Sequence, residues 1–441
     1  MVAVAEHLST YLADFEQAAK RRVGEPAWLQ AARKSGMQRF AQAGFPTTHD
    51  EEYKYTSLTR LAKTAFSLAG AAADHVRAQD LAPWRFEELE GDLLVFVNGR
   101  FAAELSQLTG KGLEVESLGA ALAGNHAGLE AHLTRHTAKR DNVFAALNTA
   151  FFEDGAVIRV PDRAVVEKPV HLIFVSTAHE AAMVSHPRVL IVAGRDSEAK
   201  VIESYLGLGD NVYWTNAVTE INAGANARLE HCRLQQEGGK AFHTSFVEIH
   251  QERDSNVTTH SLSLGASLAR NDVEVVLDGE PTECTLNGLY AVRDRQHVDN
   301  RTCIDHAKPH GTSHQLYKGV LDGQSTGVFN GKIIVRPDAQ KTDAIQSNKN
   351  LLLSDKAEIN TKPQLEIDAN DVKCTHGATV GQIDEEAVFY LRSRGIGYAE
   401  ARALLTYAFA ADILERVSLE PVRQRVEKTL MSWLAGEESV Q

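Results

Sequence analysis

The sequence predicts a mainly β fold: a right-handed parallel β-helix core flanked by N-terminal and C-terminal helical domains. Short runs rich in β-branched residues begin near Gly155, and each ends at Gly, Asn or Asp. Two motifs recur through these runs at nearly constant spacing. Helical periodicity lies on either side of them. We therefore expect a mostly helical domain at residues 1–140, the β-helix at 141–382 and a helical domain at 383–441.

The first domain is expected to be mostly helical because its apolar residues follow helical spacing. Leu8, Leu12 and Phe15 lie on one face of a first helix, and a second run begins at Trp28. The exception is a short strand expected at residues 93–98, which an Asn-Gly turn closes.

The middle of the chain repeats itself. The first motif begins at Asn216, Ser245, Asn271, Asn300 and Asn330, at intervals of 29, 26, 29 and 30 residues. The second begins at Val201, Leu229, Val257 and Cys284, at intervals of 28, 28 and 27 residues. Strand-like composition excludes a helical solenoid, and propeller blades are larger, at about 40–45 residues. A parallel β-helix of stacked coils remains, with an irregular antiparallel sandwich of accidental spacing as the alternative.

Helical periodicity returns after Gln382. Asp384 is placed to cap a helix and Gly395 to end it, and Pro421 can begin the last helix. Between them an apolar stripe recurs every four residues, at Leu405, Phe409, Ile413 and Val417. The stripe is wide enough for both a small core and a docking surface, and packing alone is the alternative.

Composition and charge exclude several classes of protein. The 441 residues carry a net charge of −13, which repels phosphate backbones, so no nucleic-acid partner is expected. No apolar run is long enough to cross a bilayer, and the first residues lack the pattern of a secretion signal. The four cysteines stand far apart without a CxxC pair. We therefore expect a cytoplasmic protein with no membrane partner.

Known catalytic motifs are absent from the sequence. It contains no phosphate-binding GxxxxGK[ST] loop, no complete dinucleotide fingerprint, no HExxH and no GxSxG. We expect that the chain is not an enzyme and does not hydrolyse ATP by itself. A β-helix enzyme acting on metals or carbohydrates would need convergent carboxylates on one face, and no compelling set is present.

Two groups of residues have the chemistry of metal ligands. The first comprises Cys303, Asp305, His306, His310 and His314. Pro309 and Gly311 predict a turn within this segment, which would point the side chains in different directions and favours surface or hydrogen-bonded histidines.

The second group is the pair Cys374 and His376. Side chains two residues apart on a strand share a face, so the thiol and the imidazole would project together. They could ligate iron or zinc, and the alternative is a strand end with an inert, packed thiol.

Three long motifs resemble the SufB/SufD family, which builds iron–sulfur clusters. They lie at residues 141–155, 372–381 and 385–396, and residues 50–56 extend the resemblance over nearly the whole chain. The resemblance implies a β-helix core with flanking helical domains. It also implies a complex with SufB and with SufC, the ATPase of the SUF system.

Within the family the chain is more similar to the SufD branch. SufB carries a cysteine late in its β-helix, and the matching stretch here is residues 354–363, where Ala357 takes the place of that cysteine. SufB also has Glu-His-Glu where this chain has Thr375, His376 and Gly377. The resemblance thus implies a non-catalytic scaffold that pairs with SufB and binds SufC. The alternative is a SufB-like subunit that itself carries the nascent cluster.

The resemblance also assigns roles to particular residues. His376 lines the junction with SufB and is a transient metal ligand there, with Cys374 beside it. The C-terminal helical domain docks SufC, which we place on Leu405, Phe409 and Ile413. We expect no cofactor stably bound by the chain alone, a transient iron–sulfur cluster at the junction, and a possible homodimer when the chain is isolated.

Overall fold

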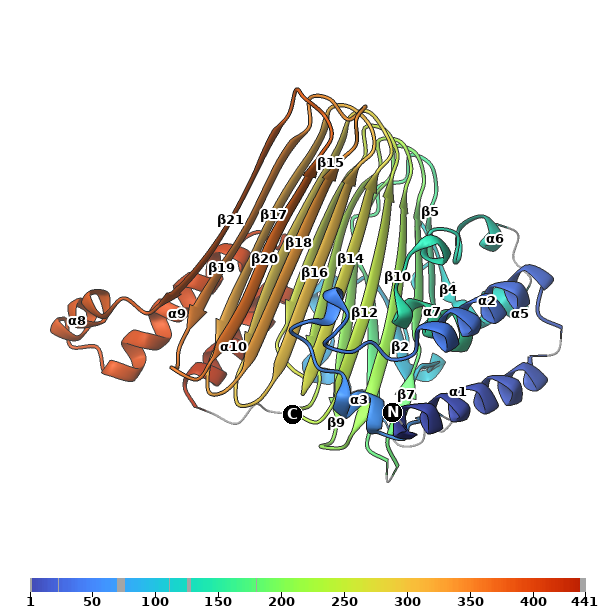
Figure 1. The fold of residues 1–441 in the computed structure, drawn as a ribbon, viewed down its shortest axis with the longest axis horizontal. Helices are drawn as coiled ribbons and strands as arrows, with labels where there is room; N and C mark the ends of the chain where they lie inside the picture. Colours follow the sequence, from blue (N-terminus) through green and yellow to red (C-terminus); the bar gives the residue numbers. More distant parts are fainter. Residues whose placement is uncertain are drawn as a thin grey trace.

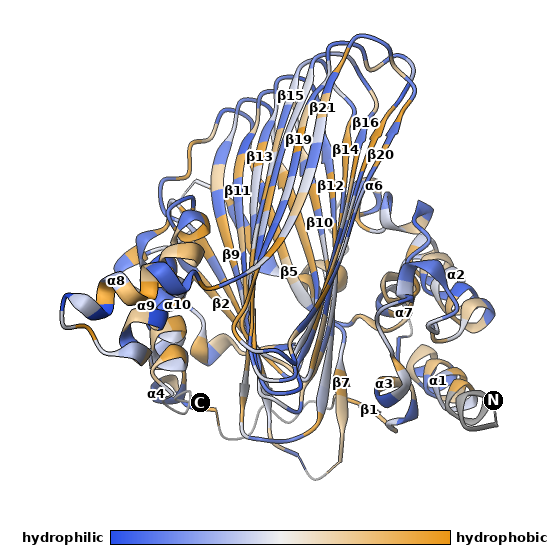
Figure 2. Ribbon diagram, turned by 60° about the vertical axis from the view of Figure 1, so that its left-hand side comes forward, coloured by the Kyte–Doolittle hydropathy of each residue, from blue (hydrophilic) through white to orange (hydrophobic). Residues whose placement is uncertain are grey.

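Two long sheets of parallel strands face each other in the computed structural model, which describes residues 2–22, 24–69, 76–110, 112–124, 128–179 and 181–436 (Figures 1 and 2). Between residues 155 and 382, successive strands join the two sheets alternately, so that the chain winds as a β-solenoid. Each coil contributes one strand to each sheet and pairs in parallel with the coil before it. The parallel pairing confirms the β-helix and excludes the antiparallel sandwich.

Sheet A contains the strands β4 (Glu114–Ser117), β5 (Gly155–Val160), β8 (Arg188–Ala193), β10 (Tyr213–Ala223), β12 (Phe242–Gln251), β14 (Leu268–Leu277), β16 (His297–His306), β18 (Thr326–Val335) and β20 (Glu358–Ile367), with β1 (Ser67–Leu68) and β7 (Met183–Ser185) beside them. Sheet B contains β2 (Asp92–Val97), β3 (Arg100–Phe101), β6 (Val170–Thr177), β9 (Glu198–Leu208), β11 (Arg228–Gln236), β13 (Asn256–Ser263), β15 (Thr282–Val292), β17 (Gly311–Leu321), β19 (Asp343–Leu352) and β21 (Lys373–Gln382). The strand expected at residues 93–98 is β2. Because β2 and β4 extend the two sheets, the N-terminal region joins the solenoid directly.

The repeated motifs correspond to the two sheets. Those of the first kind lie on strands of sheet A and those of the second kind on strands of sheet B. Ser245, Asn271 and Asn300 are direct neighbours in register. The first and last members of this motif are displaced by one residue, since Ser245 pairs with Ala217 and Asn300 with Phe329.

Helices cover the outer faces of both sheets (Figure 2). The N-terminal helices are α1 (Val2–Arg21), α2 (Ala27–Ala43), α3 (Thr59–Lys63), α4 (Ala78–Leu81), α5 (Leu118–Ala123), α6 (Leu129–His132) and α7 (Val143–Phe151). The C-terminal helices are α8 (Glu385–Ser393), α9 (Tyr398–Leu414) and α10 (Glu420–Leu434). Helices α1, α2 and α7 pack with Trp214 and Phe242 of sheet A, whereas α9 and α10 pack with Ile202 and Leu262 of sheet B. No helix among the described residues has both the length and the apolar character needed to cross a membrane.

The interior between the sheets is largely apolar. Alternate residues of every strand point inward, and Val201, Ile249, Val273 and Ile304 belong to one continuous core cluster. Buried polar side chains interrupt this core where they bond to one another. Arg233, for example, is fully buried and donates hydrogen bonds to three side chains on two other strands, β12 and β13.

A buried ion pair attaches the N-terminal region to the outer face of sheet A. Arg188 donates to Glu220 through Nε at 2.9 Å and through Nη2 at 2.5 Å, and both side chains are almost inaccessible to solvent. Arg188 also donates to Asn148 of α7 at 3.1 Å. Glu220 accepts from the Thr134 amide at 2.9 Å and the Thr137 hydroxyl at 3.2 Å. Arg188 and Glu220 make all of these hydrogen bonds only when the N-terminal region is packed against sheet A.

Glu220→Gln is therefore expected to destabilise the protein. The substitution leaves the buried Arg188 guanidinium without a compensating charge, which costs about 3 kcal/mol. Urea unfolding followed by circular dichroism should show a lower midpoint. Asp210→Asn is the control, because the Asp210–Lys240 pair is more than half exposed and contributes less than about 1 kcal/mol. Equal shifts for the two variants would contradict the role of the buried pair.

Candidate functional site: the open end of the solenoid

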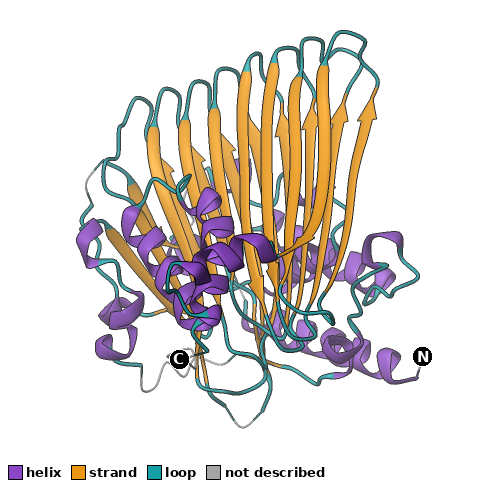
Figure 3. Ribbon diagram, turned by 90° about the vertical axis from the view of Figure 1, so that its left-hand side faces the viewer, coloured by secondary structure: helices purple, strands orange, loops and turns teal. Residues whose placement is uncertain are grey.

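The solenoid ends at β20 and β21 without a cap from further strands. These two strands are the terminal members of sheets A and B, and no described strand pairs with their outer edges. Figure 3 shows the molecule from the side on which this last coil lies. Ile367 and Val380 on these strands are 39% and 50% exposed, although the corresponding positions one coil earlier are largely buried. Free edge groups and exposed apolar side chains together form a surface suited to pairing with another chain.

Cys374 and His376 both belong to columns that point into the solenoid. Cys374 follows Ala344 in register, and Ala344 is fully buried. His376 follows Gln346 and Gln315, which are also buried. Because the pleat is the same in every coil, the two side chains lie on the inward face of β21, at the mouth of the interior. His376 itself is exposed, since no later coil covers it.

The column of His376 continues inward as a line of hydrogen bonds. Gln346 donates to the Gln315 side-chain oxygen at 2.8 Å, and Gln315 donates to the Thr302 hydroxyl at 2.5 Å. Within the part of the chain that the structure describes, the buried side-chain oxygen of Gln346 has no hydrogen-bond partner, and neither has the hydroxyl oxygen of Thr361 on β20. Buried polar atoms are normally paired, so the last coil has unmet hydrogen-bonding capacity close to its open end.

The four cysteines differ in accessibility. Cys284 is buried inside the solenoid and Cys232 between sheet B and the C-terminal helices, and burial raises the pKa of Cys284 to about 12. Cys303 lies on the outer face of sheet A, where partial burial raises its pKa to about 12. Burial also raises the pKa of Cys374, but this thiol is much less covered.

Ala357 lies in the turn before β20. Its side chain is buried against the solenoid core, and a methyl group offers no atom that can bind iron.

The histidine-rich segment does not form a metal site in the described part of the chain. His306 points inward and bonds to the Ser313 hydroxyl at 2.9 Å, whereas Asp305 pairs with Arg336 on the outer face. His310 lies in the turn between β16 and β17, and His314 lies on sheet B. Among the described residues, no group of three or more His, Cys, Asp or Glu is placed to hold a metal ion. The expected turn at Pro309 and Gly311 does separate these side chains.

The apolar stripe of the C-terminal region is used for packing. Ile413 is fully buried against sheet B, and the Phe409 ring lies 4.7 Å from the ammonium group of Lys318 on β17. Leu405 packs with Leu351 and with Val388 of α8. The residues named from the sequence for SufC docking thus lie largely beneath the surface.

The exposed apolar residues of this region lie elsewhere. Phe389 and Tyr390 on α8 are 73% and 58% exposed, and Tyr398 and Leu404 on α9 are 48% and 38% exposed. Sequence reasoning missed them, although a signal was present. Phe389 and Tyr390 are adjacent, and a helix with one buried face cannot bury both.

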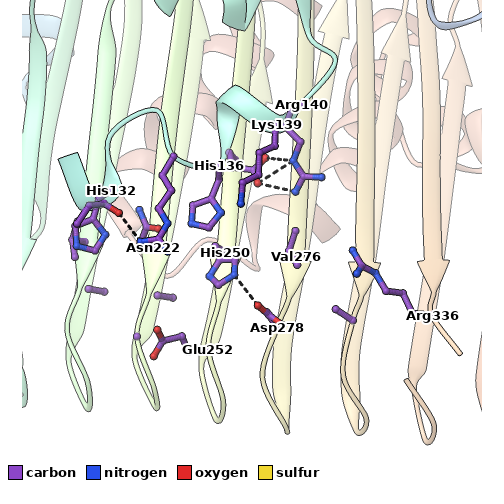
Figure 4. Close-up of a pocket in the computed structure, with 18 residues that line it drawn as sticks. His132, His136, Lys139, Arg140, Asn222, His250, Glu252, Val276, Asp278 and Arg336 are labelled. Atoms are coloured by element: carbon purple, nitrogen blue, oxygen red, sulfur yellow. Dashed lines mark hydrogen bonds and ion pairs between the residues drawn. The ribbon is translucent and has the colours of Figure 1, made fainter. Parts of the chain in front are cut away.

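A second polar recess lies on the outer face of sheet A, beneath the segment that carries α6 (Figure 4). The cavity measures about 550 Å³. His136 stacks on His250 with 4.4 Å between ring centroids, and Arg140 forms a bidentate pair with Glu248. Burial lowers the pKa of His136 to about 4 and raises that of Glu248 to about 7. The recess therefore combines two stacked imidazoles with a bidentate Arg–Glu pair.

Comparisons with known proteins identify the family. The model of the SUF system FeS cluster assembly, SufBD core domain, matches residues 174–409, and that of the SufBD protein N-terminal region matches residues 5–172. The chain therefore belongs to the SufBD family of the SUF system for iron–sulfur cluster assembly.

Individual relatives agree with this assignment. The iron–sulfur cluster assembly protein SufD of Escherichia coli is 35% identical over 91% of this chain and 92% of its own length. A SufBD family protein of Synechocystis is 35% identical over 87% and 86% of the two chains. SufD of Bacillus subtilis is 26% identical over 91% and 93%.

Cys374 is expected to react first with a thiol reagent in the native protein. Its raised pKa keeps the thiolate fraction low at neutral pH, so the rate should increase as pH rises toward and above 9, the ordinary value for this thiol. Labelling with Ellman's reagent should show one fast thiol that Cys374→Ser removes. Cys303→Ser is the control and should leave the fast phase intact. Loss of the fast phase in the Cys303→Ser variant would contradict the prediction that Cys374 is the more accessible thiol.

Proposed function

We propose that this chain is a SufD-type scaffold subunit of a SUF assembly complex. It is not a catalyst, pairs with SufB through the open end of its solenoid, and binds the SufC ATPase through its C-terminal helices. The uncapped last coil, with His376 and Cys374 at its mouth, is the observation that carries the proposal. The identity with SufD proteins over nine-tenths of the chain supports it.

The physical basis for pairing is the unsatisfied edge of two sheets. Two solenoid ends of the same cross-section can continue each other's hydrogen bonding, which buries Ile367 and Val380 at the same time. SufB, a member of the same family, is the partner we assign. A second copy of this chain would use the same edge when SufB is absent.

A nascent cluster is the cargo at this junction. His376 supplies an imidazole, whose nitrogen is a suitable ligand for iron. Ala357 argues against the alternative of a SufB-like subunit that anchors the cluster, because a methyl group cannot ligate iron. We infer that the chain alone retains no stable cluster after anaerobic reconstitution and desalting.

His376→Ala is expected to reduce the cluster content of the complex to a small fraction of the wild-type value. The substitution removes the imidazole from an exposed position, so folding and assembly with SufB and SufC should persist. Iron and sulfide are measured in the complex purified anaerobically after co-expression. Cys374→Ser should have the smaller effect, since a partly covered thiol is more often part of the packing.

Thr375→Ala is the matched control for His376→Ala. Thr375 lies between the two residues but follows Ile345, which is 45% exposed, so its column faces outward. If the His376→Ala complex had the wild-type cluster content, a role of His376 in cluster assembly would be refuted. A complex that fails to form would instead place His376 in the pairing surface.

Docking of SufC is assigned to the exposed apolar residues of α8 and α9. Deleting the whole C-terminal region would be a poor test, because α9 and α10 cover Ile202, Leu262 and Leu289 of sheet B. Single exposed positions are better suited, since the solenoid stays covered.

Phe389→Asp is expected to weaken SufC binding by at least about tenfold, as for a central apolar residue of an interface. The side chain is 73% exposed, so the free energy of unfolding should barely change. Binding is measured by calorimetry with purified SufC. Met431→Asp on α10 is the control, because this exposed residue lies outside the α8–α9 surface. Equal binding by the Phe389 variant and the wild type would refute this docking surface.

A further inference from the structure

A groove with unpaired positive charge runs along the outer face of sheet A, where its strands begin. Two adjoining cavities of about 500 and 440 Å³ form the groove. Both are lined by Arg60 of α3, by Ser267, and by Arg295 in the turn before β16. In Figure 1, α3 lies in front of the ends of these strands.

The two guanidinium groups lack carboxylate partners. Neither Arg60 nor Arg295 forms an ion pair within the described residues, and both side chains are exposed. Arg60 donates one hydrogen bond, to the Ser267 hydroxyl at 3.0 Å, and lies over the Phe242 ring. Its remaining N–H groups are free to bind a ligand.

Two carboxylates, those of Asp294 and Glu358, also line the cavities, and within the described residues neither forms an ion pair with Arg60 or Arg295. Asp294 lies 3.9 Å from Arg293, and Glu358 accepts a hydrogen bond from Asn360 at 3.0 Å. A third cation, Lys54, lines the cavity nearer the last coil. Arg60 and Arg295 are the charged residues that line both cavities.

This arrangement contrasts with the rest of the same face. Arg140 is paired with Glu248, Arg336 with Asp305, and Arg301 with Glu52. In a chain with a net charge of −13, carboxylates are abundant, yet within the described residues none forms an ion pair with Arg60 or Arg295. Two like charges beside one hollow repel each other until an anion lies between them.

The backbone that carries Arg295 is held in place by its neighbours. The Gln296 amide donates to the Arg293 carbonyl at 3.0 Å, and the Gln296 side chain accepts from the Arg293 amide at 2.9 Å. The next turn stacks on this one, since the Gln324 amide donates to the Asp294 carbonyl at 2.6 Å. Preorganised donors bind a ligand with a smaller loss of entropy.

We propose that this groove binds a small multivalent oxyanion, of the polyphosphate or polycarboxylate class. Guanidinium groups recognise such anions through paired N–H donors. The Ser267 hydroxyl adds a neutral donor beside Arg60. The site lies on the outer face of sheet A, away from the inward-facing His376 and Cys374, and does not depend on the proposed function.

Arg295→Ala tests the proposal, because this exposed side chain makes no hydrogen bond within the described residues that folding requires. Pyrophosphate and citrate are the probes, each titrated into the full-length protein by calorimetry at low ionic strength. We expect saturable binding of one or both, weakened at least about tenfold in the variant by loss of a charge-assisted hydrogen bond. Preference between the two probes assigns the anion to the phosphate or the carboxylate class.

Lys63→Ala is the matched control. Lys63 is also an exposed cation on α3 but does not line either cavity. Its removal changes the net charge by the same amount as Arg295→Ala and should leave binding unchanged. Absence of saturable binding of both probes, or equal weakening in the two variants, would overturn the proposal. Thermal unfolding of each variant verifies that the fold is retained.

Discussion

In-register parallel pairing between successive coils is the constraint on which the rest of the structure depends. It carries the side-chain alternation of one strand to every later strand in the same sheet, so each inward position becomes a column along the solenoid. This pairing determines which residues fill the interior and which form the outer surfaces that the helices cover. It also determines the direction of the side chains in the last coil. His376 points toward the interior because Gln346 and Gln315 do.

The same constraint explains how the helical regions attach. The outer columns of a regular solenoid present long rows of similar residues, and in sheet A one row runs through Glu220, Glu248 and Glu274. Stacked carboxylates repel one another unless cations separate them. Arg188 and Arg140 pair with this row and lie between the sheet and the N-terminal segment. The row of carboxylates is thus stabilised by these two arginines, and Arg140 also attaches the N-terminal segment to the sheet.

The sequence predicted the solenoid because the period of the coil is visible in residue types, but residue types alone did not settle the register. Asn216 was grouped with Ser245, yet Asn216 donates to the Phe144 carbonyl on the outer side, whereas Ser245 bonds to the buried Arg233. A shift of one residue exchanges the two faces of a strand, and turns of unequal length between coils hide that shift. The shared face of Cys374 and His376 was predicted correctly because the two residues lie on one strand.

Features that join distant segments were beyond the sequence. Arg60 and Arg295 meet only because α3 packs over the strand ends of sheet A. The C-terminal stripe at Leu405, Phe409 and Ile413 predicted an apolar surface correctly, but periodicity does not say whether a sheet or a partner covers it. Here sheet B covers most of the stripe, and the apolar residues that stay exposed are those that do not follow its four-residue spacing.

A solenoid built by stacking cannot satisfy its own ends, and this chain treats its two ends differently. At the first coil, β3 and β4 pair in antiparallel fashion with β2 and β5 and so cover both edges with the chain's own backbone. At the last coil, no described segment does the same for β20 and β21. The chain continues into α8 instead, which leaves the mouth uncovered. An edge that is closed at one end and open at the other gives pairing a single direction, which is what a subunit needs in order to join one partner without forming a fibre.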